Sequence, residues 1–127
     1  MGKVSNLLGG VAIATSLISL PSMAEGVDES VAAVMPKVVE WRHHIHANPE
    51  LGNQEYKTAE YIAEHLRALG FDKVETGVAV TGVVGTLKGG KPGASVALRA
   101  DMDALPVTEQ TGLPYASKVT TMWRGKE

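Results

Sequence analysis

The chain has 127 residues, no cysteine and a formal net charge of −2. Without cysteine it can form neither disulfides nor zinc sites built on thiolates within these residues. Its basic residues are scattered rather than clustered, which gives no electrostatic footprint for nucleic acid and favours a small polar or acidic ligand.

The first 24 residues have the layout of a secretory signal peptide. A single basic residue, Lys3, precedes an apolar run from Leu7 to Leu20, and the small residues Ser22 and Ala24 stand at positions −3 and −1 of a cleavage site. The run is shorter than the about 20 apolar residues of a transmembrane helix. We therefore expect residues 1–24 to be removed, the mature chain to be periplasmic or secreted, and no membrane association afterwards. An N-terminal anchor or a buried helix is the alternative.

Residues 25–127 are enough for one small domain, or for a piece of one. A helix is predicted to start near Asp28 and Glu29, since both favour a first helical turn. Because Pro36 interrupts the pattern, either the helix proper starts near Pro36 or the earlier turn is a kinked extension. Asn48-Pro49 ends the helix. Apolar residues at three- and four-residue steps are predicted to pack against a sheet, namely Val31, Val34, Val38, Trp41 and Ile45.

Three histidines, His43, His44 and His46, lie in the last turn of this helix. Neighbouring residues on a helix point about 100° apart, so His43 and His44 cannot readily share one metal ion. Hydrogen-bonding and cationic side chains are common near a helix C-terminus. These histidines are therefore predicted to have a structural role.

A second helix is predicted from Glu55 to Leu69, followed by Gly70 as a left-handed C-cap. Its charged residues are interpreted as a solvated face, not a binding patch. Its apolar face consists of Ala59, Ile62, Ala63, Leu66 and Leu69.

Strands are predicted from Lys73 to Thr76 and from Val83 to Leu87, joined by a mobile or bulged connection from Gly77 to Gly82. After a tight turn at residues 88–93, Ser95 to Leu98 is predicted as a third, buried strand. Two helices followed by three strands indicate an α/β fold with helices packed on a sheet.

Asp101 and Asp103 follow the third predicted strand and are the best chemical lead in the chain. In open α/β sheets, ligands bind beyond the carboxyl ends of strands, so two acids one residue apart suit a metal or polar-substrate site. The alternative is that both aspartates only form turns and accept backbone hydrogen bonds.

The segment from Arg99 to Pro106, together with Glu109 and the stretch from Thr111 to Ser117, resembles a family of metal-dependent amidohydrolases and peptidases. Hippurate hydrolase, N-acyl-amino-acid amidohydrolase and the plant auxin-conjugate hydrolases typify this family. The resemblance covers about Val31 to Lys118. Three further blocks agree and come in the family's order: Trp41–Gly52, Thr58–Gly70 and Thr76–Gly85.

The resemblance implies that residues 25–127 are the incomplete N-terminal part of a zinc-exopeptidase-like catalytic domain, with helices packed on a mixed sheet. The chain would stop before the family's His-Ala-Cys-Gly-His-Asp block, which provides a cysteine and a histidine of the metal site. The complete enzyme would use a divalent metal (Zn, Mn or Ni) to hydrolyse an N-acyl amino acid to a carboxylate and a free amine, and could be a homodimer.

Among the residues present, Asp103 matches the family's aspartate that supports the metal ligands. Asp101 stands where related peptidases have a metal-binding histidine. Both are therefore the candidate catalytic residues, and neither is assigned as a metal ligand. His46 matches the histidine of a His-x-x-Pro-Glu block, which implies a place near the site, but Asn48 replaces the second histidine that many relatives carry.

A second function class remains open, a non-enzymatic exported α/β module for interaction or ligand binding. Glu109, Tyr115 and the two aspartates fit either class. For this chain by itself we expect no stably bound metal, no hydrolysis, and a tendency to associate through an exposed sheet edge.

Overall fold

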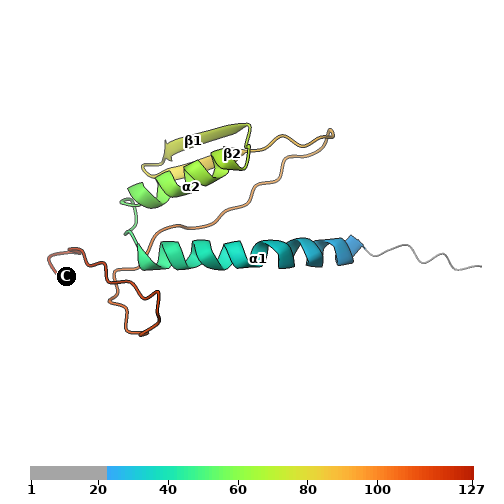
Figure 1. Cartoon of the computed structure of the whole chain (residues 1–127). Helices are drawn as coiled ribbons and strands as arrows, with labels where there is room; N and C mark the ends of the chain where they lie inside the picture. The colour runs from blue at the N-terminus through green and yellow to red at the C-terminus, as the bar shows by residue number, and fades with distance from the viewer. Residues whose placement is uncertain (1–22) are drawn as a thin grey trace, which may run out of the picture. The chain divides into compact units, whose positions relative to one another are not determined.

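The computed structural model describes residues 23–127. The chain divides into two units, Met1–Val34 and Met35–Glu127. The described elements are α1 (Met23–Ala47), α2 (Tyr56–Ala68), β1 (Lys73–Val78) and β2 (Gly82–Thr86), so the predicted α/β class is confirmed (Figure 1).

The predicted signal peptide falls mainly on residues 1–22, which lie outside the described residues. Its cleavage after Ala24 stays a prediction. None of the helices from residue 23 onward has the length and apolarity to cross a membrane.

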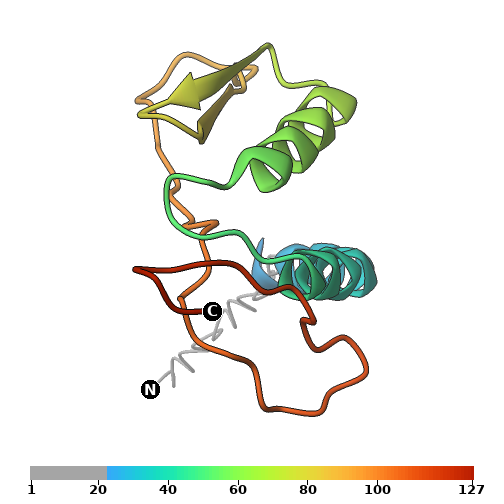
Figure 2. The same cartoon turned by 90° about the vertical axis from the view of Figure 1, so that its left-hand side faces the viewer.

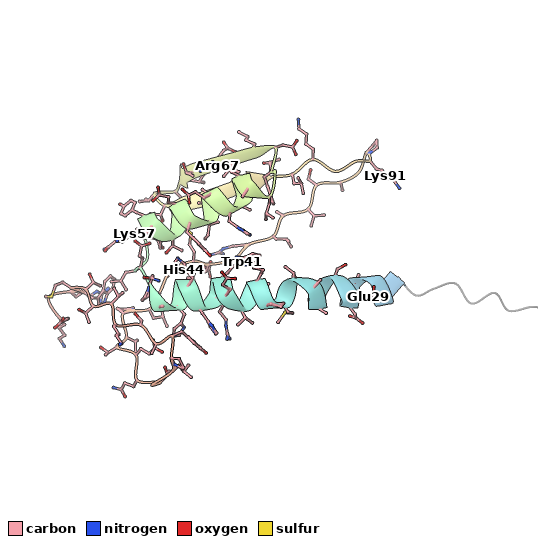
Figure 3. All side chains as sticks on the ribbon, viewed as in Figure 1. Glu29, Trp41, His44, Lys57, Arg67 and Lys91 are labelled. Carbon is pink, nitrogen blue, oxygen red and sulfur yellow. The ribbon has the colours of Figure 1, made fainter. Side chains whose placement is uncertain are left out.

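Helix α1 continues through Pro36, which lies next to the boundary between the two units. The prediction that its whole apolar stripe packs against a sheet is wrong. Val31, Val34 and Val38 are exposed. Only its C-terminal part has aromatic partners on α2. Trp41 lies 4.4 Å from His65 and His44 lies 4.3 Å from Tyr61, measured between ring centroids, and Figure 3 places both α1 side chains on the side that faces α2.

Helix α2 is ordered at both ends by local interactions. At its start, the Glu50 carboxylate accepts hydrogen bonds from Lys57 N (3.2 Å), Thr58 N (2.7 Å) and Thr58 Oγ1 (2.9 Å), which satisfies N–H groups that a helix leaves free. At its end, Gly70 has a φ of +79°, and Phe71 N donates to Leu66 O while Gly70 N donates to Arg67 O. This is a Schellman motif, so the predicted glycine C-cap is confirmed.

Strands β1 and β2 form an antiparallel hairpin in which Lys73 pairs with Thr86 and Thr76 pairs with Val83. The register shifts between Thr76 and Val78, at Gly77, whose φ is +74°. The predicted bulge is thus present, although the strand continues past it to Val78. Residues 23–127 contain one two-stranded antiparallel sheet, and the mixed sheet expected of the whole domain stays a prediction.

Helix α2 packs against both strands and lies alongside the hairpin in two views at right angles (Figure 2). Gly85 of β2 allows this packing, since a Cβ there would lie 2.8 Å from Phe71 Cδ1 and 3.1 Å from Leu66 Cδ1. Thr81 and Glu55 are buried and joined by a hydrogen bond of 2.6 Å. The buried apolar residues among residues 23–127 are few: Leu51, Ala59 and Ala63.

The predicted third strand, Ser95 to Leu98, is not a strand. After the loop whose tip carries Lys91 (Figure 3), residues 92–103 run back without regular structure. The side chains of Val96 and Leu98 are 87% and 97% exposed. A strand needs a neighbour for its N–H and C=O groups, and the described residues offer none to this segment.

Candidate functional site

The loop with the two aspartates is held by the segment that follows α1. Ala104 N donates a hydrogen bond of 2.8 Å to Glu50 O, and Leu51 forms a parallel β-bridge with Ala104. Since the Glu50 side chain also holds the start of α2, this one segment connects the aspartate loop to both helices.

Asp101 and Asp103 have different surroundings. The Asp101 carboxylate pairs with Arg99 at 2.8 Å, and both side chains are largely exposed. Asp103 is also exposed, but its Oδ2 lies close to Gly52, where an added Cβ would come within 3.5 Å of it. Asp103 therefore lies next to the segment that organises the site.

The described residues by themselves do not fit a catalytic metal ion. A catalytic zinc-type site has about three protein ligands and an open position. From residue 23 to 127, no three His, Asp or Glu side chains are grouped so that they could hold a metal.

At the end of α1, histidine and arginine side chains contact the C-terminal segment, and together with their partners they form a second cluster beside the aspartate loop. His43 stacks on Tyr115 with 3.7 Å between ring centroids, and His46 meets the same ring edge-on at 5.4 Å. The Arg42 guanidinium lies 5.9 Å from the Tyr115 centroid. The C-terminal segment lies beside this end of α1, as Figure 2 shows.

Glu109 is the polar centre of this cluster. His46 Nε2 lies 2.9 Å from its Oε1, Ser117 N donates to its Oε2 at 2.6 Å, and the Thr111 hydroxyl donates to Oε1. The hydrogen bond from Thr111, followed by those from His46 and Ser117, lowers the pKa of Glu109 from 4.5 to about 2. Glu109 is thus a fixed, ionised carboxylate at neutral pH.

Residues of the aspartate loop and of the cluster around Glu109 line one open hollow of about 1040 Å³ in the unit Met35–Glu127. Asp103 contributes from the aspartate loop, and His46 and Glu109 contribute from the second cluster. The wall also contains apolar side chains, among them Ile45, Leu51, Met102, Leu105 and Val107. A cavity with apolar walls and a few polar groups is typical of small-molecule sites.

The structural role predicted for the histidines agrees with these contacts, but the sequence reasoning missed their partners. His43 and His46 are three residues apart and so share one face of α1, a spacing that could have indicated a common partner. Glu109 is 63 residues away from His46, and no local pattern links the two.

Known proteins resemble the chain over most of its length. Thermostable carboxypeptidase 2 of Saccharolobus solfataricus is 47% identical over 98 residues, which are 76% of this chain and 25% of the relative. Hippurate hydrolase of Campylobacter jejuni is 52% identical over 77 residues, 61% of this chain and 20% of the relative. Further relatives are named N-acyl-L-amino acid amidohydrolase, N-acetyldiaminopimelate deacetylase and N-acetyl-L-cysteine deacetylase. No protein-family model matches the chain.

The backbone also resembles a solved structure. A provisionally assigned aminohydrolase from methicillin-resistant Staphylococcus aureus matches with a TM-score of 0.69 and 43% identity, over 77% of this chain and 25% of that one. The chain thus spans about a quarter of the length of the curated relatives that it matches. The predicted resemblance is confirmed. The chain is homologous, over about a quarter of their length, to hydrolases that include hippurate hydrolase and N-acyl-L-amino acid amidohydrolase.

Proposed function

We propose that residues 25–127 are the N-terminal part of the catalytic domain of a metal-dependent amidohydrolase. In the reaction, water cleaves the C–N bond of an N-acyl amino acid. The acyl carbon takes the hydroxyl group to become a carboxylic acid, and the amine nitrogen takes the proton. The observation that carries the proposal is the 52% identity with hippurate hydrolase, whose substrate is of this kind.

In this proposal the metal belongs to the whole protein, and Zn, Mn and Ni are the candidate ions. Residues 23–127 contain no cluster of three His, Asp or Glu side chains that could hold a metal. Under this proposal the remaining ligands belong to the rest of the enzyme. Asp103 would orient a metal-binding imidazole, which fixes the tautomer of a ligand histidine and raises its basicity. Asp101, paired with Arg99 at the surface, is assigned a weaker part in the site.

The location is proposed on the amino-acid pattern of residues 1–24. Export to the periplasm or the medium, with cleavage after Ala24, accounts for the basic residue, the apolar run and the small residues in that order. Intact-mass measurement of the exported protein tests this, and a mature chain that still begins with Met1 contradicts it.

A chimera tests the proposed activity. Residues 31–118 of this chain replace the matching segment of the Campylobacter jejuni hippurate hydrolase, and glycine release from hippurate is measured with saturating metal. We expect hydrolysis by the chimera and a decrease of about 10- to 100-fold in Asp103→Asn, the usual effect of losing a carboxylate behind a metal ligand.

The control is Glu64→Gln, which neutralises an exposed carboxylate on α2 and should leave hydrolysis unchanged. A chimera that folds and binds metal but releases no glycine contradicts the proposed function. Equal activity of the Asp103→Asn and parent chimeras contradicts the role of Asp103 alone.

A further inference from the structure

The aspartate loop and the segment that follows it are fixed to α1 and its extension at two points. At the first, Ala104 N donates to Glu50 O at 2.8 Å. At the second, His46 Nε2 lies 2.9 Å from Glu109 Oε1. The two contacts are four residues apart along the first segment, His46 to Glu50, and five residues apart along the second, Ala104 to Glu109. Residues 46–50 and 104–109 therefore form a short closed loop of chain.

Glu109 is suited to hold this second point because it organises its own segment at the same time. It accepts hydrogen bonds from the Thr111 hydroxyl and from Ser117 N, which fold residues 109–117 back onto the carboxylate. Its side chain is 14% exposed, while that of His46 is 40% exposed. The Glu109 side chain is thus partly covered by its own segment, and a hydrogen bond to a charged carboxylate is stronger than one between neutral groups.

A third contact joins the same two parts of the chain. Tyr115 lies in the segment that Glu109 folds, and its ring stacks on His43, one helical turn before His46. The end of α1 therefore contacts this segment through both an aromatic stack and a polar bond. Both contacts limit how far residues 105–117 can move from the helix.

Asp103 directly precedes the closed loop of chain formed by residues 46–50 and 104–109. Ala104, its neighbour, makes the first bond, and Gly52 lies against its Oδ2. If Ala104 N–Glu50 O were the one contact, Asp103 could still move together with its loop. The second contact, between His46 and Glu109, restricts this motion. Catalytic groups have to be held within a fraction of an ångström of their working geometry.

We propose that His46 and Glu109 form a clamp that holds the loop of Asp101 and Asp103 against the end of α1, and that both act as positioning residues for Asp103. This inference rests on the proposed hydrolase for its catalytic consequence. The clamp itself is a property of the chain and can be tested without activity.

The first test is amide hydrogen exchange on the full chain, followed by NMR. The amides of Ser117 and Ala104 should be protected in the parent, because both donate hydrogen bonds within the clamped region. In His46→Ala both amides keep their acceptors, Glu109 for Ser117 and Glu50 for Ala104, but the segment that joins them is held at one point fewer. Each amide should therefore exchange faster than in the parent. His46→Gln, which keeps a donor, should restore much of the protection of both amides.

His44→Ala is the matched control, because His44 lies on the same turn but stacks on Tyr61 of α2. It should leave the Ser117 and Ala104 amides protected. Amides within α2, such as Ala63, report whether any variant loses its fold. Equal protection of the Ser117 and Ala104 amides in the parent and in His46→Ala overturns the clamp.

The second test uses the hippurate hydrolase chimera described above. A positioning role predicts that His46→Ala lowers kcat by about tenfold with little change in KM, and that His46→Gln restores most of it. If the parent chimera is inactive, the proposed function fails while the exchange experiment still decides the clamp. If the clamp is present but kcat is unchanged in His46→Ala, the positioning role is wrong.

Discussion

Glu109 is the residue whose titration should be easiest to detect in the stability of this chain. Its hydrogen bonds from Thr111, His46 and Ser117 lower its pKa from 4.5 to about 2. A pKa that is lower in the folded state contributes stability above the unfolded value, and this contribution is lost as the pH falls from about 4.5 towards 2. The urea midpoint should therefore decrease over this range.

Glu109→Gln isolates this contribution, since it removes the charge but keeps an acceptor. We expect a lower urea midpoint at pH 7 and a weaker dependence on pH between 4.5 and 2. Glu64→Gln, on the exposed face of α2, should keep the parent's pH dependence. If Glu109→Gln and the parent lose stability in parallel, Glu109 is not the group responsible.

The buried pair of Thr81 and Glu55 should contribute to the stability of the fold. Burial acts to raise the pKa of Glu55, but hydrogen bonds from Thr81 and from backbone N–H groups outweigh it, so the pKa is lowered. Thr81→Val leaves this buried carboxylate without its hydroxyl donor, which should destabilise the fold by about 1–3 kcal/mol. Thr86→Val, at an exposed position of β2, should change the free energy of unfolding by less than about 0.5 kcal/mol. Urea unfolding measures both, and equal effects would contradict the importance of the pair.

At the scale of elements, the packing of α2 on the hairpin depends on the absence of a side chain at Gly85. A methyl group there would lie 2.8 Å from Phe71 Cδ1, so Gly85→Ala forces the ring or the strand to shift. We expect a loss of about 1–3 kcal/mol, as for other overpacked sites. Gly90→Ala is the control, since nothing lies within 4 Å of its added Cβ. Equal stability of the two variants would mean that Phe71 moves aside without loss of packing.

The sequence predicted α2, β1 and β2 well, because local patterns define them. It wrongly predicted a strand from Ser95 to Leu98, because a strand needs a partner elsewhere in the chain. Helix α2 has a regular apolar face, a glycine cap at its end and the nearby Glu50 carboxylate at its start, and β1 and β2 are joined by a short turn. Ser95 to Leu98 has the composition of a buried strand, yet within residues 23–127 no other strand pairs with it. Strand formation depends on a neighbouring backbone, which composition cannot supply.

At the scale of the whole molecule, the exposed apolar residues after the hairpin should promote association. Val96, Leu98, Leu105 and Val107 are each more than 75% exposed, and Val96 and Leu98 lie where the backbone has no strand partner among residues 23–127. Light scattering of the mature chain should give a mass that rises with concentration, and Leu98→Lys should lower it. Leu69→Lys, at an exposed apolar position directly after α2, should leave the mass unchanged. A parent that stays monomeric at all concentrations contradicts this prediction.

Metal binding is also a property of the whole molecule. Calorimetric titration of the mature chain with zinc, manganese and nickel should give weak binding, because two exposed aspartates with water as the remaining ligands hold such ions loosely. Hippurate should not be hydrolysed above background. Sub-micromolar binding with metal-dependent glycine release would contradict this, and would mean that Asp101, Asp103 and His46 take part in a more complete site.

The sequence by itself determined the α/β class, the second helix with its glycine cap, the bulged hairpin and the family resemblance, because each depends on neighbouring residues or on ordered motifs. It also indicated Asp101 and Asp103 as a pair. Only the tertiary structure separated them, since Asp101 pairs with Arg99 at the surface while Asp103 lies against Gly52. The bond between His46 and Glu109 likewise needed the fold, because it joins residues 63 positions apart, and such a contact depends on the path of the chain between them rather than on any local pattern.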